Sequence, residues 1–328
     1  MKAIVVILAF ILASGTGCAG QTKDSLLVMF WNMENFFDYR DGGEGESDNE
    51  FSSMGLRRWT KKRFYAKCNA VAKSIYWLSD KYGKFPDIIG FAEIENSNVL
   101  YRLLRETALK KTDYTFIHYD GHDRRGIDVA FLYRKSVLEP LSVTRRIPLY
   151  ENGDTVVTRD ILHVEMRHKK VNGAVEKNSI YHFIVNHHPS KYGGAKESHP
   201  KRIAAMTTLK ALSDSLLSLG SSSIIAMGDF NDTPDSEIFD IIKGTLDNKA
   251  SALADRGQGT IRYEGKWDMI DMFLVDYQSS ANAEMKVEYI PFLMVKDTRH
   301  PGMKPFRTYS GPRYIGGVSD HCPILLEY

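Results

Sequence analysis

The stretch LLVMFWNMENFF, residues 26 to 37, decides the fold class and raises the question of function. It begins with apolar residues suited to a buried β-strand. Asn32, Glu34 and Asn35 then interrupt the apolar run, and a buried amide or carboxylate without a partner costs on the order of a few kcal/mol. Because side chains alternate along a strand, Asn32 and Glu34 should share one face while Met33 points to the other. Asn35 lies off that face and is expected to turn or cap the chain.

Further apolar runs follow along the chain and alternate with helical patterns. Residues 60–80, 97–111 and 199–219 have the apolar spacing of amphipathic helices. Two packed mixed β-sheets flanked by helices, in a single α/β (α+β) domain, are therefore expected. The runs that predict strands are DIIGFAEI (87–94), YTFIHY (114–119), DVAFLYR (128–134), ILHVEMRH (161–168), SIYHFIVNHH (179–188), SSIIAMGDF (222–230), WDMIDMFLVD (267–276) and CPILLEY (322–328).

Composition excludes several classes of protein. The chain has 328 residues, of which 43% are hydrophobic and 26% charged, and this is ordinary globular composition. The formal net charge of +2 is too small to indicate a nucleic-acid partner by itself. The segment 56–84 is strongly basic, which fits either a solvated helix face or a surface for a polyanion. The acidic, Gly-rich segment 38–50 predicts a loop.

The N-terminus has the pattern of a secretory signal peptide. MKAIVVILAFILASGTGCAGQ combines one Lys, a short apolar run and small residues. Cleavage after Gly20 would leave residues 21–328 as the mature catalytic domain, exported to the periplasm or secreted. An outer-membrane lipoprotein anchored at Cys18 is the alternative. No later segment predicts a transmembrane helix, and only Cys68 and Cys322 follow the signal, so no thiolate cluster indicates structural zinc.

Polar residues gather where the predicted strands end. Alternation places Glu93 with Glu95, and Asp229 with Asn231, on common faces. A cluster of partly buried carboxylates requires a cation or hydrogen bonds to stay ionised. Oxygen ligands without thiolate favour Mg²⁺, with Mn²⁺ or Ca²⁺ as alternatives. We therefore expect a metal site containing Glu93 and Asp320, and the motifs NHHP and SDH would add histidines suited to phosphate-ester hydrolysis.

The motifs WNMEN, FAEIEN, NHHPS, GDFND, IDMFLV and SDH, in this order, resemble the endonuclease/exonuclease/phosphatase superfamily. The resemblance spans nearly the whole mature chain and implies the DNase-I-like four-layered sandwich. The motifs MENFFD, DRRGIDVAFLYR and FRTYSG more specifically resemble secreted bacterial members described as predicted extracellular nucleases.

The resemblance implies a metal site and assigns its residues. Glu93 falls where the family carries its principal metal carboxylate, and Asn32 and Glu34 fall on the Asn-x-acid pair beside it. Asp320 matches an acidic residue of the metal site.

The resemblance also implies the residues that act on the phosphate. Asp229 and Asn231 match the residues that activate the attacking water and orient the phosphate. His321 matches the histidine that contacts the scissile phosphate, and Asp271 matches the acid that hydrogen-bonds this histidine. Such a pair would fix the tautomer of His321 and favour its protonated form.

The second histidine is ambiguous, because NHHPSK offers both His187 and His188. Neighbouring strand residues point to opposite faces, so only one of them can line the site. The pattern of the secreted members selects His187, which we prefer, and the pattern of many phosphatases selects His188.

Three arginines and an aspartate are further candidates for phosphate binding. Arg124 and Arg125, with Asp128, precede a strand that should reach the same face, and arginine forks bind phosphate well. Arg202, early in its helix, is a similar candidate. For each arginine, an ordinary loop or helix position is the alternative. Glu95 is expected to bond to the backbone.

These features together predict a Mg²⁺-dependent phosphodiester hydrolase, most simply a secreted endonuclease that acts on DNA or RNA. A phosphatase, or a sphingomyelinase-like esterase for a small or lipid phosphate, is the alternative. A non-catalytic binding protein on the same fold ranks last. Nucleic acid is the expected partner, and a monomer without a stable protein partner is the expected state.

Overall fold

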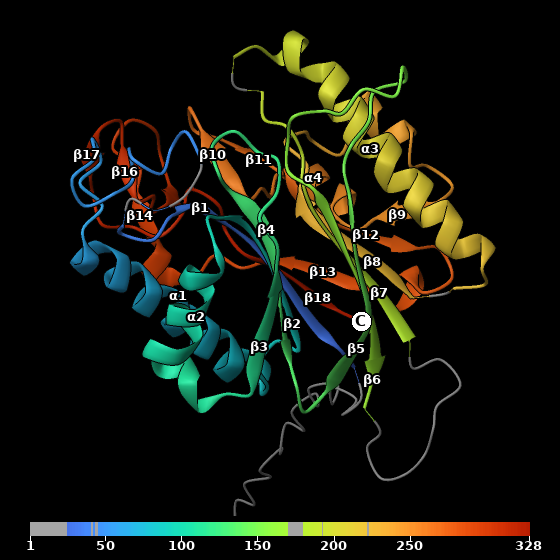
Figure 1. Cartoon of the computed structure of the whole chain (residues 1–328), viewed down its shortest axis with the longest axis horizontal. Helices are drawn as coiled ribbons and strands as arrows, with labels where there is room; N and C mark the ends of the chain where they lie inside the picture. The colour runs from blue at the N-terminus through green and yellow to red at the C-terminus, as the bar shows by residue number, and fades with distance from the viewer. Residues whose placement is uncertain (1–24, 41, 43–44, 170–179, 192, 222) are drawn as a thin grey trace, which may run out of the picture.

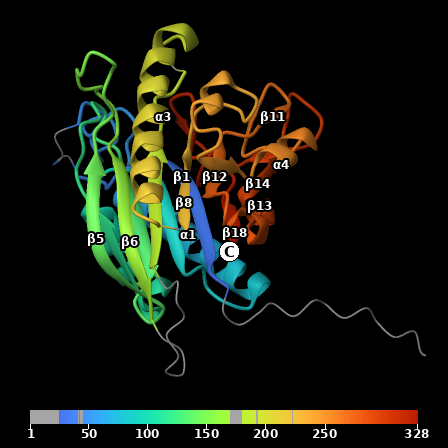
Figure 2. The same ribbon diagram turned by 90° about the vertical axis from the view of Figure 1, so that its right-hand side faces the viewer.

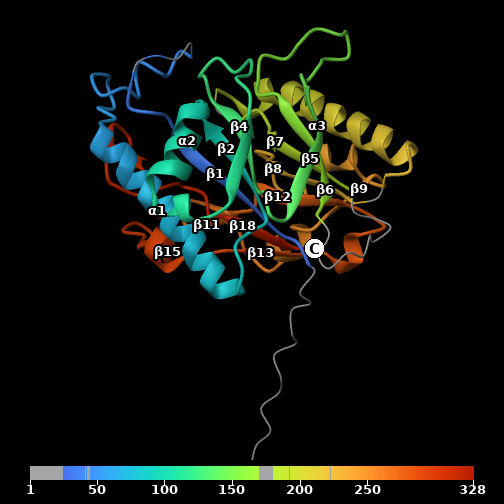
Figure 3. The ribbon, with the colours of Figure 1, turned by 60° about the horizontal axis from the view of Figure 1, so that its bottom comes forward.

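The computed structural model describes residues 25–328 apart from 41, 43–44, 170–179, 192 and 222. The expected signal peptide and Cys18 lie outside the described residues. Within the described part of the chain, no helix has the length and apolar character needed to cross a membrane. Two six-stranded β-sheets form the centre of the molecule and helices lie outside both of them (Figures 1 and 3).

The first sheet is organised around β1 (Leu27–Phe36), which runs parallel to β2 (Ile88–Ile94). The alternating side chains of β1 enter two different cores, as the sequence predicts. Phe30 packs with residues of the second sheet, whereas Trp31 and Met33 pack with residues of the helices. All other pairings in this sheet are antiparallel, and the remaining strands are β3 (Tyr114–His118), β4 (Asp128–Arg134), β13 (Glu284–Val287) and β18 (Ile324–Glu327).

The second sheet has the strand order β5-β6-β7-β8-β12-β9, in which only β7 and β8 are parallel neighbours. Its helix α3 (Ala195–Ser218) lies along the strands (Figure 2), and Met206, Leu209 and Leu212 of this helix belong to the core of the sheet. The strands are β5 (Leu138–Arg146), β6 (Ile161–His168), β7 (Ile180–His187), β8 (Ile224–Asp229), β9 (Leu246–Asn248) and β12 (Asp271–Asp276).

Helices α1 (Lys61–Tyr82) and α2 (Ser97–Glu106) cover the outer face of the first sheet (Figure 3). Two sheets between helical layers form the predicted four-layered DNase-I-like α/β sandwich. The smaller elements are α4 (Ser251–Asp255), the 3-10 turns Ala108–Lys111, Glu237–Asp240, Ser280–Asn282 and Pro291–Leu293, and three hairpins, β10 (Ile261–Tyr263) with β11 (Lys266–Asp268), β14 (Met294–Lys296) with β15 (Met303–Pro305), and β16 (Tyr309–Ser310) with β17 (Arg313–Tyr314).

Two boundaries differ from the sequence prediction. The run 267–276 is not one strand, because Thr260 Oγ1 accepts hydrogen bonds from the backbone N–H groups of Ile270 and Asp271 and separates β11 from β12. The predicted helix 97–111 ends at Glu106 and continues as a 3-10 turn. Strand β5 was not predicted, because it is an edge strand with many exposed side chains.

The topology brings the ends of four central strands together. β1 and β2 are parallel, so Asn32 and Glu93 leave the first sheet at the same edge. β7 and β8 are also parallel, and His187 lies opposite Asp229 in their register. Asp271, at the start of the antiparallel β12, pairs with Asp229 from the other side. The polar residues predicted to act together therefore meet between the two sheets.

Candidate active site

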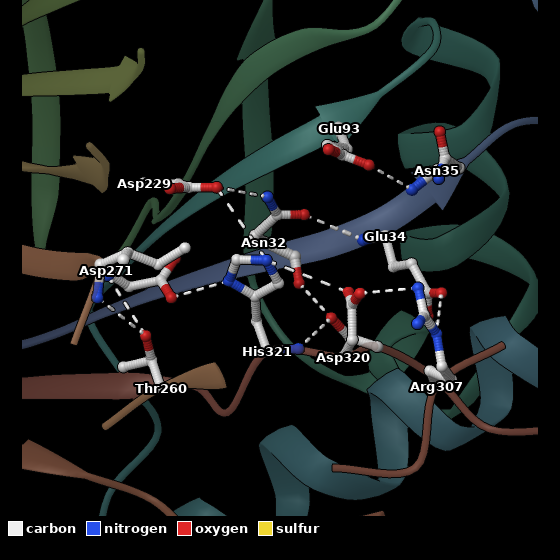
Figure 4. Close-up of polar contacts among 12 residues, drawn as sticks. Asn32, Glu34, Asn35, Glu93, Asp229, Thr260, Asp271, Arg307, Asp320 and His321 are labelled. Carbon is white, nitrogen blue, oxygen red and sulfur yellow. Dashed lines mark hydrogen bonds and ion pairs between the residues drawn. The ribbon is translucent and has the colours of Figure 1, made fainter. Parts of the chain in front are cut away.

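Side chains from both sheets converge on Asp229, which is almost fully buried (Figure 4). Its Oδ2 accepts a hydrogen bond of 2.9 Å from Asn32 Nδ2, and its Oδ1 accepts one of 2.9 Å from the backbone N–H of Asn231. Burial and the neighbouring carboxylate of Asp271 raise the pKa of Asp229 to about 7, although His321 opposes this shift. A carboxylate with such a pKa is suited to accept a proton near neutral pH.

His321 forms a tight pair with Asp271 across the start of β12. The distance from His321 Nδ1 to Asp271 Oδ2 is 2.7 Å. Burial disfavours the charged imidazole, but Asp271 outweighs burial and holds the pKa of His321 well above its usual value. His321 Nε2 lies 4.0 Å from Asp229 Oδ2 and 3.9 Å from Asp320 Oδ1. The arrangement therefore presents a cationic N–H group beside two carboxylates.

The backbone of the SDH motif is held directly against β1. Trp31 Nε1 donates to the carbonyl oxygen of His321, at 2.9 Å. Ser319 Oγ donates to the carbonyl oxygen of Asn32 and accepts from the backbone N–H of His321. The C-terminal motif is thus fixed relative to the first strand.

His187, and not His188, lies in this cluster. His187 Nε2 is 3.6 Å from Asp229 Oδ2 and 3.8 Å from Glu93 Oε1. The ring of His188 instead packs edge-on against Phe230, with 4.8 Å between centroids. Burial, together with nearby arginines, holds the pKa of His187 well below its usual value, so this imidazole is neutral.

The backbone bends at three of the polar strand-end positions, which changes the expected faces. Glu34, Glu93 and Asn231 have φ angles of 46°, 62° and 52°, in the left-handed region that side chains rarely adopt. Simple alternation therefore fails here. Glu93 turns toward His187, and the space among Glu93, His187 and Asp229 is called the cleft below. Glu95 accepts a hydrogen bond from the backbone N–H of Asp38, as expected for a residue bonded to backbone.

Both the nitrogen and the oxygen of the Asn32 amide make hydrogen bonds. Besides the bond to Asp229, its Oδ1 accepts a hydrogen bond from the backbone N–H of Glu34. Asn35 also turns the chain, and its N–H donates to Glu93 Oε2 at 2.7 Å. The structure thus gives Asn32 an orienting position between Asp229 and the bend, and its role at the metal stays a prediction.

The acidic wall of the cleft consists of Glu93, Glu34 and Asp320. Glu93 Oε1 is approached by Arg125 and His187 only at ion-pair separations of 3.6 Å and 3.8 Å. Glu34 is bound more closely, because Arg307 Nε and the backbone N–H of Thr308 both donate to its carboxylate. Glu34 therefore supports the wall from behind, whereas Glu93 offers an oxygen to the cleft.

Arg307 joins the two remaining carboxylates of this wall. Its Nη2 donates to Asp320 Oδ2 at 2.9 Å, while its Nε bonds to Glu34. Burial and the charge of Asp320 raise the pKa of Glu34 to about 7, so the wall is short of positive charge even with Arg307 present. Carboxylate oxygens whose negative charge is only partly compensated fit a divalent cation. Glu93 and Asp320 would hold this ion, and water and substrate would complete its coordination shell.

A second set of three ligand atoms, from Asp229, Asp271 and His321, also lies within 4.8 Å. Because Asp271 Oδ2 is already bonded to His321 Nδ1 and the high pKa of His321 disfavours a metal on its ring, we place the cation at the acidic wall instead.

Sequence reasoning missed three basic residues around the cleft. Lys67, from the basic run, is buried beneath it, and its Nζ donates to the carbonyl oxygen of Glu34 at 2.8 Å. Burial lowers the pKa of Lys67 to about 8, against the opposing effect of Glu34. Arg307 lay in the quoted motif FRTYSG without an assigned role. Helical periodicity gave the signal for Lys67, which falls on the buried face of α1.

The third missed residue is Arg159, which is buried behind the NHHP motif. Its Nη2 donates to the carbonyl oxygen of His188, and its Nη1 contacts Asp123 Oδ2 at 3.1 Å. Arg125, which faces Glu93, also contacts Asp123. These contacts connect the loop before β4 to the end of β7, and nothing in the local sequence around Arg159 indicated this.

Three of the four predicted phosphate ligands, all except Arg125, make their contacts outside this cluster. Arg202 is almost fully buried and donates to Asp232, Ser198 and the carbonyl oxygen of Ala195, so the prediction of a phosphate ligand is wrong in geometry. Arg202 lies in the first turns of α3, shortly after the NHHP motif in sequence, but its side chain points into the protein.

Asp128 was also predicted to bind phosphate, but it lies beside His118 at the far end of the loop before β4. Burial raises its pKa to about 7. Arg124 is exposed and bonds to Glu46, so only Arg125 of the arginine pair faces Glu93.

Comparison with known proteins shows the family and the fold of the chain. The family model of the endonuclease/exonuclease/phosphatase family matches residues 27–328. A search of curated proteins finds no match. An endonuclease/exonuclease/phosphatase family protein from Bacteroides thetaiotaomicron superimposes with a TM-score of 0.55 at 18% identity, covering 92% of this chain and 97% of that chain.

Two other solved structures are similar over the same extent. Mannosyl-6-phosphatase from Bacteroides thetaiotaomicron gives a TM-score of 0.55 at 16% identity, covering 92% of this chain and 99% of that one. Danio rerio TDP2, complexed with a single-strand DNA product, gives 0.54 at 13% identity, covering 93% and 97%. At such identities the likeness concerns the fold, and the family follows from the match over residues 27–328: the chain belongs to the endonuclease/exonuclease/phosphatase family.

Proposed function

We propose that the chain is an exported, divalent-metal-dependent phosphodiesterase that acts as an endonuclease on DNA or RNA. One observation carries the proposal. Two histidines flank the buried carboxylate of Asp229, with His187 Nε2 at 3.6 Å and His321 Nε2 at 4.0 Å from its Oδ2. The bond to Asp271 raises the pKa of His321, burial lowers the pKa of His187, and burial raises the pKa of Asp229 to about 7. A base, a proton donor and a neutral hydrogen-bonding group around one point are the groups needed for in-line hydrolysis of a phosphate ester.

The roles follow from the positions of the side chains. Asp229, oriented by Asn32 and by the N–H of Asn231, accepts a proton from the attacking water. His187 donates a hydrogen bond from Nε2 to a phosphate oxygen. His321, held protonated by Asp271, neutralises charge on the phosphate and protonates the leaving oxygen. Asn231 Nδ2 donates to the carbonyl oxygen of His188 and thereby fixes the turn after Asp229.

Glu93 and Asp320 would hold Mg²⁺, or Mn²⁺ or Ca²⁺ in its place. When bound, such an ion supplies charge neutralisation to the phosphate and the leaving oxygen. Arg307, which now joins Glu34 to Asp320, keeps Glu34 in place behind the ion. Arg125 adds a second positive charge from the opposite side of Glu93.

Basic side chains near the cleft support a polyanionic substrate, although fewer of them are exposed than the sequence suggests. They are called the basic rim below. Within the basic run 56–84, Lys81 pairs with Glu288, Lys84 pairs with Asp87, and Lys67 is buried. Exposed lysines remain at the start of α1, at Lys61 and Lys62. Arg125 and Arg307, with 39% and 49% of their side chains exposed, extend this charge to the cleft.

A phosphatase for a small phosphate ester is the second candidate. The similarity to a mannosyl-6-phosphatase favours it, since that protein carries the same fold over nearly its whole length. A sugar phosphate and a nucleic acid would meet the same central groups and differ in their need for the basic rim.

The test is hydrolysis of plasmid DNA, RNA, a sugar phosphate and sphingomyelin in parallel, with and without Mg²⁺. We expect cleavage of nucleic acid that requires the metal, weakens steeply with added salt and disappears in Asp229→Asn. Hydrolysis of the sugar phosphate alone would replace the endonuclease by the phosphatase. Activity on none of them, with no Mg²⁺ binding, would indicate a non-catalytic binding protein.

A further inference from the structure

A second group of metal-binding side chains lies away from the catalytic cluster, where β3 ends and β4 begins. His118 is the last residue of β3, Asp120 follows it in the loop, and Asp128 is the first residue of β4. One potential ligand atom from each of these three residues lies within 4.8 Å of the others. The proposed function leaves all three without a role.

His118 provides the observation that points to a ligand. Its side chain is only 1% exposed. Nδ1 lies 3.3 Å from Ser97 Oγ, but Nε2 has no hydrogen-bond partner among the described residues and faces Asp128 Oδ2 at 4.0 Å. A buried ring nitrogen without a partner is costly, and this separation is too long for a hydrogen bond.

The two aspartates differ in exposure, and only the exposed one is free to rotate toward an ion. Asp128 is buried and accepts a hydrogen bond from the backbone of Gly121, so its carboxylate is fixed. The side chain of Asp120 is 86% exposed, and its Oδ1 lies 3.9 Å from His118 Nδ1. A tetrahedral ion with bonds of about 2.0–2.2 Å holds its ligand atoms roughly 3.4 Å apart, a distance that rotation of Asp120 can reach.

We propose that His118, Asp120 and Asp128 bind a divalent transition-metal ion, with Zn²⁺ the best fit. The two carboxylates balance the double positive charge of the ion, the neutral imidazole is the third ligand, and water takes the fourth position. Arg145 is the cation next to this group, but its Nη1 is occupied by Asp160 Oδ2 and by the carbonyl oxygen of Asp120. Imidazole distinguishes this site from the all-oxygen wall expected to take Mg²⁺.

The bound ion would fix both ends of the loop 119–127. That loop carries Arg125, which faces Glu93 in the catalytic cleft, and Asp123, which contacts Arg159. The site is therefore structural, and it holds a charged residue of the cleft in place from a distance.

The experiment is a titration of Zn²⁺ into the whole chain, competed by a chromophoric chelator. The background carries Glu93→Gln and Asp229→Asn, which removes two carboxylates of the catalytic cleft. We expect one saturable Zn²⁺ site that is weakened at least a hundredfold by His118→Gln and at least tenfold by Asp120→Asn. Co²⁺ in its place should give the visible absorption of a tetrahedral ion, and the same substitutions should abolish it.

His199→Gln is the matched control, because His199 is also a histidine beside a carboxylate but its partner, Glu237, lies on the surface. This variant should bind Zn²⁺ as the background does. Asp120 is exposed, so Asp120→Asn cannot fail merely by unfolding the protein. Unchanged Zn²⁺ binding in His118→Gln and Asp120→Asn would overturn the proposal, as would the absence of any saturable site, since the cluster would then hold only a bridging water.

Discussion

The two walls of the cleft hold their polar groups by different means. On the first sheet, Glu34 and Glu93 reach the cleft through left-handed backbone, and backbone N–H groups and Arg307 fix their carboxylates. On the second sheet, His187 and Asp229 end regular parallel strands and face each other in register. The first wall is built for an ion, and the second is built around proton-carrying groups.

The cleft also separates the charges of its two histidines. His321 lies beside Asp271 and is held protonated, whereas His187 lies near Arg125 and Arg159 and is held neutral. Two residues of the same type thereby acquire different roles from their neighbours alone.

Asp229 joins the two walls, so its loss should have the largest effect. We expect Asp229→Asn to lower kcat at least a thousandfold, or about 4 kcal/mol, because Asp229 is the carboxylate proposed to accept the proton of the attacking water. Steady-state hydrolysis of the preferred substrate measures this. A variant that keeps near-full activity would contradict the role of Asp229.

The same variant should be more stable than the parent when metal is chelated. The pKa of Asp229 is raised from near 4 to about 7 on folding, so the ionised form is disfavoured in the folded state. The free energy of unfolding of the parent therefore falls as pH rises from about 4 to 7, and the variant does not show this fall because Asn does not ionise. Thermal unfolding in chelator at pH 5 and pH 8 should show a larger advantage for the variant at the higher pH.

Replacing Asp271 with Asn should reduce kcat by about a hundredfold and move the alkaline limb of the pH–rate profile to lower pH. The direction follows because removing the carboxylate lowers the pKa of His321, so the proton is lost earlier as pH rises. If Asp271→Asn lowers the rate but leaves this limb in place, the limb belongs to another group.

On the first wall, Glu93→Gln should weaken metal binding and leave the proton-transferring groups unchanged. We expect the Mg²⁺ concentration for half-maximal activity to rise at least tenfold, because Glu93 offers the carboxylate oxygen that faces the cleft. Unfolding in chelator should change little. An unchanged Mg²⁺ requirement would move the ion away from this wall.

The two adjacent arginines give the smallest and most discriminating effect. Arg125→Ala should raise KM for nucleic acid several-fold and reduce its salt dependence, because Arg125 lies beside Glu93. Arg124→Ala serves as the matched control, since Arg124 is exposed and bonds to Glu46. Equal effects of the two substitutions would show that only the net charge of the loop matters.

The sequence predicted the layers and most of the cluster because strand periodicity and short polar motifs carry this information locally. The motifs named Glu93, Asp229, Asp271 and His321, and the structure brings them together. Strand alternation indicated that only one of His187 and His188 lines the site, and the motif pattern of the secreted members favoured His187, in agreement with the geometry.

The remaining errors have physical causes. Alternation assumes extended backbone, and it fails at Glu34 and Glu93, where φ is positive. Arg202 lies near a motif in sequence, but its direction depends on how α3 packs. Lys67 and Arg159 bond to backbone carbonyls that are distant in sequence. Helical periodicity could place Lys67 on the buried face of α1 but could not name its partner, and no local pattern indicated Arg159.

The central claim is that the protein holds one histidine charged and one neutral around Asp229. It is tested most directly by NMR titration of the imidazole Cε1–H signals in chelator, assigned with His187→Gln and His321→Gln. The account predicts that His321 stays protonated and His187 stays neutral from pH 6 to pH 8, so each signal shows at most the small shift caused by titration of the neighbouring Asp229. Two signals that titrate together near pH 6.5 would contradict it.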